Sequence, residues 1–125
     1  MSTRVYITGV GVVSSLGLGK EEFYRSVATG QSGISPVSSF DATNLGRLYA
    51  GEVKQFRARD HLTAVESRRM GRCSAMALAA ARMAVGDAGI DASHLKGPRA
   101  AVVLGTTMGE ADILEDLEGA WIQKG

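Results

Sequence analysis

Residues 4–19 read RVYITGVGVVSSLGLG, a short β-forming run that passes into a loop punctuated by glycine. Val5, Tyr6 and Ile7 favour a strand over residues 4–8, which Gly9 ends. Glycine is the residue that allows tight turns and close approach of one backbone to another. We therefore expect tight backbone packing in a strand–turn–strand unit, with Val12 and Val13 buried.

The pattern Gly9-x-Gly11-x-x-Ser14 after a strand also suggests a nucleotide-binding turn. Ser14 replaces the third glycine, however, and the next helix begins about six residues later, too far on for its N-terminus to hold a pyrophosphate. No second strand ending in an acidic residue follows at the spacing of that motif. An NAD(P)-binding oxidoreductase therefore stays only a distant alternative.

The rest of the chain alternates predicted helices and strands. The expected elements are a helix over 20–29 stopped by Gly30, a short peripheral strand over 48–53, a long helix over 63–89, a buried strand over 100–104 and a helix over 110–123. Thr63 and Glu66 have the spacing of a capping box, and the long helix carries an alanine stripe that lets other backbones approach it closely. This order of strands and helices predicts a layered α/β fold, with the alanine helix packed on both sides.

The composition narrows the class of protein. The chain has 125 residues, of which 45% are hydrophobic and 22% charged, and its net charge is +1. These values are typical of a soluble globular protein and give no support to nucleic-acid binding. No apolar run is long enough to span a membrane, and no signal-peptide pattern is present. A single cysteine cannot form an internal disulfide, so we expect a cytoplasmic location.

Several blocks of the sequence carry a resemblance to a known family. In order, they are residues 4–17, GQSGI at 30–34, FD at 40–41, AGEV at 50–53, RMGR at 69–72, ALAAA at 77–81, DAGI at 87–90 and VLGTTMG at 103–109. Together they resemble the N-terminal portion of the β-ketoacyl-[acyl carrier protein] synthases, the condensing enzymes of fatty-acid and polyketide synthesis. The chain departs from that pattern at Ser15, where proline is usual, at Gly71, where an acidic residue is common, and at Glu110, where glycine is common.

The resemblance implies a thiolase-like fold with αβαβα layers that acts as a dimer and needs no cofactor. We expect residues 1–125 to form only the N-terminal part of its first half, an incomplete domain. Such enzymes move an acyl group from a carrier-protein thioester onto a cysteine, then decarboxylate a malonyl-carrier thioester and join the two, with two histidines polarising the thioester carbonyl. That cysteine and both histidines are expected beyond Gly125, so no catalytic residue is assigned here. A non-catalytic chain-length-determining partner subunit is the alternative.

Two further sites follow from the resemblance. Thr107 and Met108 stand where relatives line the acyl-chain pocket, although simple core packing is an equally good interpretation of Met108. Arg68 and Arg69 stand where relatives place basic residues that dock the acidic carrier protein. They belong to a segment, residues 54–72, with six basic and two acidic residues, which otherwise describes a solvated helix face. The implied partners are the acyl carrier protein, the remainder of the synthase and a second subunit, identical or not.

We interpret three other potentially reactive side chains, those of Cys73, His61 and His94, as structural and not as catalytic or metal-binding. Cys73 falls some ten residues into the predicted long helix, on its alanine face, so we interpret it as a small buried hydrophobic residue and not as a nucleophile. His61 and His94 lie in polar connections without the spacing of metal ligands. We interpret both as surface residues and expect no metal site.

These assignments make a direct prediction for the isolated chain. Residues 1–125 should show no turnover when assayed alone with acyl- and malonyl-carrier thioesters, because the nucleophile is expected outside them. Release of carbon dioxide and formation of a condensed product are the quantities to measure. Turnover by this chain alone would contradict the placement of the nucleophile.

Overall fold

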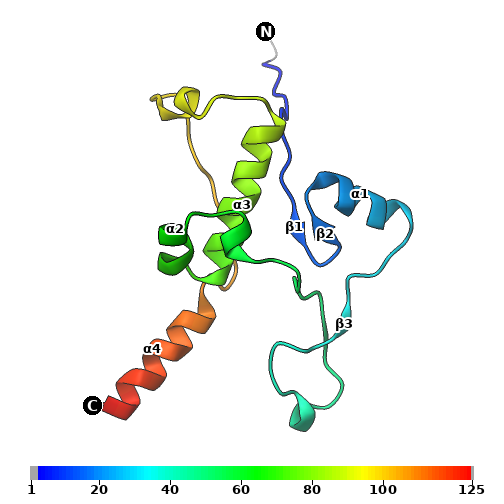
Figure 1. Cartoon of the computed structure of the whole chain (residues 1–125), viewed down its shortest axis with the longest axis vertical. Helices are drawn as coiled ribbons and strands as arrows, with labels where there is room; N and C mark the ends of the chain where they lie inside the picture. The colour runs from blue at the N-terminus through cyan, green and yellow to red at the C-terminus, as the bar shows by residue number, and fades with distance from the viewer. Residues whose placement is uncertain (1–2, 125) are drawn as a thin grey trace.

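The longest helix of the computed structural model, α3 (Arg72–Asp87), lies at the centre of the molecule, and the other elements are arranged around it (Figure 1). The structure describes residues 3–124. The remaining helices and strands are β1 (Val13–Ser14), β2 (Gly17–Leu18), α1 (Lys20–Ala28), β3 (Ser35–Pro36), β4 (Tyr49–Ala50), α2 (Ala64–Arg69) and α4 (Ala111–Lys124). Short 3-10 turns occupy Thr43–Leu45, Ala58–Asp60 and Ala92–Lys96. Each strand pair, β1–β2 and β3–β4, is antiparallel.

One side of α3 packs directly against the backbone of residues 9–11. A Cβ atom on Gly11 would lie 1.9 Å from the carbonyl oxygen of Ala80, and one on Gly9 would lie 2.1 Å from that of Ala84. Only glycine on one surface and alanine on the other allow two backbones to come so close. The predicted tight backbone packing of the glycine loop is therefore confirmed, but Val12 and Val13 are half-buried and not fully buried as expected.

A second side of α3 forms a small hydrophobic core. Ala75 and Ala79 are buried against Phe56 and Leu62, which come from the segment before α2. The ring of His61 stacks on that of Phe56 with the ring centroids 5.4 Å apart, which makes His61 a half-buried packing residue and not the expected surface residue. The expectation that the alanine helix packs on two sides is met. Ala75 and Ala79, however, lie outside the predicted stripe, whose alanines are Ala77, Ala80, Ala81, Ala84 and Ala88.

Asp87 connects the far end of α3 to the start of the chain. Its carboxylate accepts a hydrogen bond of 2.9 Å from the backbone N–H of Val10, and it pairs with the ammonium group of Lys20, the first residue of α1. The hydrogen bond from Lys20 and that from Val10 hold the pKa of Asp87 below its usual range. This one side chain therefore fixes residues 9–11 and α1 relative to α3.

The predicted long helix over 63–89 is wrong as a single element. The chain leaves the helical conformation at Met70 (φ −120°, ψ 141°), and Gly71 is the N-cap of a new helix, so α2 and α3 are separate. The capping box of Thr63 and Glu66 is confirmed at the start of α2. Because α3 begins at Arg72, Cys73 is the second residue of a helix and is exposed, which corrects the expectation that it is buried in mid-helix.

The two strands predicted over 4–8 and 100–104 are not formed, because in residues 3–124 the sheets are confined to β1–β2 and β3–β4. Both segments lack the neighbouring strand that a hydrogen-bonded ladder requires. Their side chains are bare, with Val5 90% and Val102 96% exposed. The layered αβαβα arrangement is therefore not present within the described residues. The strand predicted over 48–53 is peripheral as expected, but only two residues of it pair, with β3.

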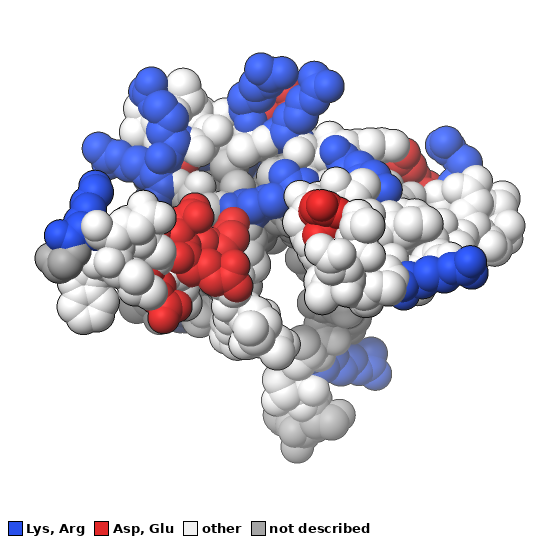
Figure 2. Space-filling model, turned by 90° about the horizontal axis from the view of Figure 1, so that it is seen from below, with Lys and Arg blue, Asp and Glu red and all other residues white. Residues whose placement is uncertain are grey.

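The helices predicted over 20–29 and 110–123 are confirmed as α1 and α4. Within residues 3–124 most of the apolar side of α4 is uncovered, with Leu114, Leu117 and Trp121 between 62% and 78% exposed. Figure 2 views the molecule from the side on which α4 lies and shows acidic side chains gathered over that helix. None of the helices described here combines the length and the apolar composition needed to cross a membrane.

The backbone contact between residues 9–11 and α3 can be tested with alanine. Gly11→Ala should lower the free energy of unfolding by roughly 1–3 kcal/mol, because its Cβ would overlap the Ala80 carbonyl. Gly86→Ala is the matched control, since Gly86 lies in the same helix with open space around it and should stabilise α3 by up to about 1 kcal/mol. Urea unfolding followed by circular dichroism gives both values. Two effects of the same sign would contradict the contact.

Candidate functional site

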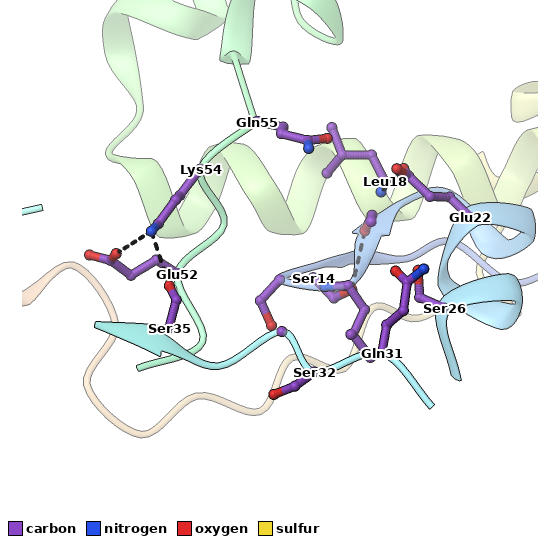
Figure 3. Close-up of a pocket in the computed structure, with 14 residues that line it drawn as sticks. Ser14, Leu18, Glu22, Ser26, Gln31, Ser32, Ser35, Glu52, Lys54 and Gln55 are labelled. Carbon is purple, nitrogen blue, oxygen red and sulfur yellow. Dashed lines mark hydrogen bonds and ion pairs between the residues drawn. The ribbon is translucent and has the colours of Figure 1, made fainter. Parts of the chain in front are cut away.

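Two of the hollows formed by the described residues differ in character, and the first is polar. It encloses about 290 Å³ between the β1–β2 hairpin, α1 and the segments that flank β3 and β4 (Figure 3). Its residues are Ser14, Ser15, Leu16, Gly17, Leu18, Glu22, Ser26, Gln31, Ser32, Gly33, Ser35, Glu52, Lys54 and Gln55.

The charged side chains of this hollow form hydrogen bonds and an ion pair with other groups of the chain. Lys54 Nζ donates to Ser35 Oγ at 3.0 Å and lies 3.4 Å from a carboxylate oxygen of Glu52, as Figure 3 shows. Glu22 Oε2 accepts the backbone N–H of Leu18 at 2.8 Å. These contacts tie the hairpin to α1 and β3 to β4. They are structural contacts, and they engage all three charged side chains of the hollow, Glu22, Glu52 and Lys54.

The second hollow is mainly apolar and lies against the first three turns of α3. It encloses about 380 Å³ and is open to solvent. On one side it is bounded by α3, on the other by the chain that leads into α4. Its residues are Val13, Cys73, Ser74, Met76, Ala77, Ala80, Leu104, Gly105, Thr106, Gly109 and Glu110. An apolar lining with a few polar groups at its edge suits an aliphatic chain carrying a polar end.

Glu110 closes the end of this hollow at the N-terminus of α3. Its carboxylate accepts the backbone N–H of Ser74 at 2.6 Å and that of Cys73 at 3.2 Å. Hydrogen bonds from Ser74 and Cys73 hold the pKa of Glu110 below its usual range. The carboxylate therefore stays ionised at neutral pH and faces the positive end of the helix.

Of the predicted pocket residues, Thr107 and Met108 lie at the mouth of this hollow and not in its wall. Both are exposed, Met108 by 73% of its surface, whereas their neighbours Thr106 and Gly109 line the space. The turn that carries all four is held by a hydrogen bond of 3.0 Å from the Gly109 N–H to Thr106 Oγ1.

Sequence reasoning missed most of the wall itself, which comes from α3. Met76, Ala77 and Ala80 face the hollow from one side of the helix. The spacing of 76, 77 and 80 is a helical one and could have identified this face, but the alanines were interpreted only as packing residues. Nothing in the sequence signals that Glu110 belongs to the N-terminus of α3, because the two are distant in the chain.

The predicted docking residues, Arg68 and Arg69, lie side by side in the last turn of α2 and are both exposed. Within residues 3–124 neither of them makes a hydrogen bond or an ion pair, so both guanidinium groups are free to meet a partner. Arg72, counted in the same basic segment, differs: its guanidinium donates to the backbone carbonyl of Val53 and lies 5.8 Å from the centre of the Phe56 ring. In the basic segment, Arg72 therefore stabilises the fold, whereas Arg68 and Arg69 can contact a partner.

A salt bridge anchors α2 beneath these arginines. Glu66 accepts from Arg82 at 2.8 Å and from the backbone N–H of Thr63 at 2.9 Å. Arg82 also donates to the carbonyl of His61 at 3.0 Å, so α2 is fastened to α3 and to the core together. These hydrogen bonds, the one from Arg82 foremost, lower the pKa of Glu66 from 4.5 to about 2.

No group of three or more His, Cys, Asp or Glu side chains among the described residues is placed to hold a metal ion. His94 is exposed, as expected, in the 3-10 turn that follows α3. Cys73 lines the apolar hollow and is exposed to solvent. The site is thus an apolar space bounded by α3 and a glycine-flanked turn, with two free arginines on the helix before it.

Comparison with known proteins identifies the same region of one family. Residues 2–123 match the family described as the β-ketoacyl synthase N-terminal domain. The chain is 32% identical over 122 residues to 3-oxoacyl-[acyl-carrier-protein] synthase 2 of Synechocystis sp., covering 98% of this chain and 29% of that protein. It is 36% identical over 116 residues to the granaticin polyketide putative beta-ketoacyl synthase 1 of Streptomyces violaceoruber, covering 93% of this chain and 28% of that protein.

A solved structure agrees with these sequence comparisons. The ishigamide ketosynthase/chain length factor superimposes with a TM-score of 0.76 and 40% sequence identity, over 90% of this chain and 28% of that one. The chain therefore spans less than a third of the length of the relatives it matches.

The anchoring of α2 predicts a specific pH dependence. The low pKa of Glu66 in the folded state means that its stabilisation is complete above the ordinary pKa of 4.5 and is lost as the pH falls toward 2. Wild type should therefore be more stable than Glu66→Gln at pH 6, and the difference should vanish by about pH 2. Urea midpoints across this range measure it. Glu118→Gln, a change on the exposed side of α4, should show no such trend, and a pH-independent difference for Glu66→Gln would contradict the anchor.

Proposed function

The chain belongs to the β-ketoacyl synthase family, and on that premise we propose that it is the N-terminal segment of a condensing domain. The proposed reaction is the decarboxylative condensation of an acyl thioester with malonyl-[acyl carrier protein] in fatty-acid or polyketide synthesis. The match over residues 2–123 carries this proposal, because it covers nearly the whole chain.

The exposure of the strand-forming segments 4–8 and 100–104 supports the proposal that further parts of a larger protein cover them. Val5, Ile7, Val102 and Val103 are between 88% and 96% exposed, although their sequences are those of buried strands. Contiguous apolar surface of this kind is normally covered in a folded protein. We propose that the remainder of the synthase supplies the neighbouring strands and completes the layered αβαβα fold.

In this proposal the chemistry is carried by residues outside the sequence described here. A cysteine thiolate takes the acyl group from the carrier and releases the carrier thiol. Loss of carbon dioxide from the malonyl thioester leaves a carbanion, which attacks the acyl carbonyl and expels the cysteine thiolate. Two histidines polarise the thioester carbonyl and so stabilise the carbanion. The proposed reaction requires no cofactor. Residues 1–125 contribute to binding the acyl chain and the carrier protein and form no covalent bond with the substrate.

The apolar hollow beside α3 is the proposed place of the acyl chain. Met76, Ala77 and Ala80 offer it an apolar wall without charge, and Thr107 and Met108 stand at its mouth. A flexible thioether can adapt to chains of different length, which supports a role for Met108 in selecting them. The proposed pocket therefore consists of the α3 wall together with Thr107 and Met108.

Arg68 and Arg69 are the proposed contact for the acyl carrier protein. They are exposed, adjacent and unpaired within the described residues, on a helix that Glu66 and Arg82 hold in place. An anchored pair of positive charges can steer an acidic partner even when the whole chain is nearly neutral.

A non-catalytic chain-length-determining subunit is the second candidate, and one observation favours it. The solved relative with 40% identity is a ketosynthase/chain length factor, so similarity over this segment is compatible with either partner. The two are distinguished by the residues that follow Gly125 in the coding sequence: a cysteine turn and two histidines indicate the enzyme, and their replacement indicates the partner. A homodimer or heterodimer and a cytoplasmic location remain predictions of the family assignment.

The carrier contact and the condensing activity are tested together by removing charge. In the full-length protein, Arg68→Gln/Arg69→Gln should raise KM for carrier-bound substrates by roughly three- to tenfold, while KM for a small acyl thioester stays unchanged. The increase should shrink at high salt, since screening weakens exposed charge pairs.

Arg47→Gln/Arg99→Gln is the matched control, because both arginines are exposed and lie outside the basic segment 54–72. Equal effects of the two double variants would contradict a specific docking site. Absence of any malonyl decarboxylation or condensation by the full-length protein, alone and with a candidate partner subunit, would contradict the proposed reaction.

A further inference from the structure

The first turn of α3 receives its cap from a distant part of the chain. A helix leaves its first backbone N–H groups without partners, and a side chain at the N-cap position usually accepts one of them. The N-cap residue here is Gly71, which has no side chain to offer. The carboxylate of Glu110 takes that role instead and accepts from both Cys73 and Ser74.

The space around Gly71 explains why a glycine stands there. Its φ of −69° and ψ of 171° are open to any residue, so the backbone conformation does not require glycine. A Cβ atom, however, would lie 2.2 Å from Glu110 Oε2 and 2.5 Å from the Cδ1 atom of Ile113. Gly71 therefore leaves the space that the ends of the Glu110 and Ile113 side chains occupy, and Gly71 and Glu110 form one structural unit.

The backbone of Glu110 is equally engaged. Its carbonyl oxygen accepts the N–H of Leu114 at 3.2 Å and so opens α4. Immediately before it, Gly109 has a φ of +59° and closes the turn that begins at Thr106. One residue thus joins the end of the turn, the start of α4 and the start of α3.

We propose that Glu110 is a positioning residue that tethers the Thr106–Gly109 turn to α3 and thereby sets the width of the apolar hollow between them. Thr106 and Gly109 line one side of that space, and Cys73, Met76 and Ala77 line the other. A tether between the two sides determines how far apart they stand. Its consequence for acyl-chain length rests on the proposed function, whereas the tether itself does not.

The tether is tested by hydrogen exchange in the full-length protein. Glu110→Ala should speed exchange of the Cys73 and Ser74 amides by about three- to tenfold, and should also loosen Gly109 and Leu114. Glu110→Gln keeps an acceptor oxygen without the charge and should increase the exchange rates of these amides by a smaller factor. It replaces the alanine variant in the test if that variant does not fold. Glu115→Ala, an exposed carboxylate of α4, is the matched control and should change none of these amides.

A double variant separates the tether from simple helix capping. In Gly71→Asp/Glu110→Ala the carboxylate nearest to the new Cβ is gone, and only the end of the Ile113 side chain has to turn aside. The aspartate can then cap α3 from its own N-cap position. Protection of Cys73 and Ser74 should then return, while Gly109 and Leu114 stay loose. The distribution of product chain lengths should be shifted in both Glu110→Ala and the double variant.

The outcomes distinguish this inference from the proposed function. If Glu110→Ala leaves exchange of all four amides unchanged, the tether is overturned whatever the protein catalyses. If the double variant restores the wild-type product distribution, Glu110 only caps a helix and the positioning role is overturned. If the full-length protein catalyses no condensation, the proposed function is overturned, and with it the effect of Glu110 on chain length. The exchange pattern still shows whether Glu110 tethers the turn to α3.

Discussion

The close approach of residues 9–11 to α3 is the contact on which the rest of this structure depends. Gly9 and Gly11 lie so near the carbonyls of Ala80 and Ala84 that no side chain fits between them. Small residues bury little apolar area, but they lose almost no side-chain entropy and bring many backbone atoms into dispersion contact. Asp87 then fixes the register by accepting from Val10. The hairpin and α1 take their positions from this contact.

The opposite side of α3 holds α2, which carries the proposed carrier contact, in place. Ala75 and Ala79 pack on Phe56 and Leu62, and Arg82 fastens α2 to the same core through Glu66. The exposed arginines of α2 therefore project from a held helix and not from a loose connection. The hollow lies along α3, and the arginines lie on α2, which is fastened to α3. The proposed chain pocket and the proposed carrier contact therefore both depend on α3 for their positions.

Local signals predicted the elements whose hydrogen bonds are made within the segment itself. α1, α4 and the capping box of α2 form where the sequence indicates, and Gly30 and Gly89 adopt positive φ values just beyond α1 and α3. The break at Gly71 was missed because the capping box before it and the alanine stripe after it were interpreted as one helix, and the position of Cys73 was wrong for the same reason. The strands over 4–8 and 100–104 failed because a strand needs a neighbour that the described residues do not contain.

The sequence by itself determined the family and the helices α1 and α4, because family motifs and helical periodicity are properties of short stretches of the chain. It also marked Gly71 and Glu110, but as two unrelated departures. Only the tertiary structure brought them together and showed that the glycine makes room for the carboxylate. The reason is physical: a helix cap needs an acceptor at hydrogen-bond distance in space, and separation along the chain says nothing about that distance.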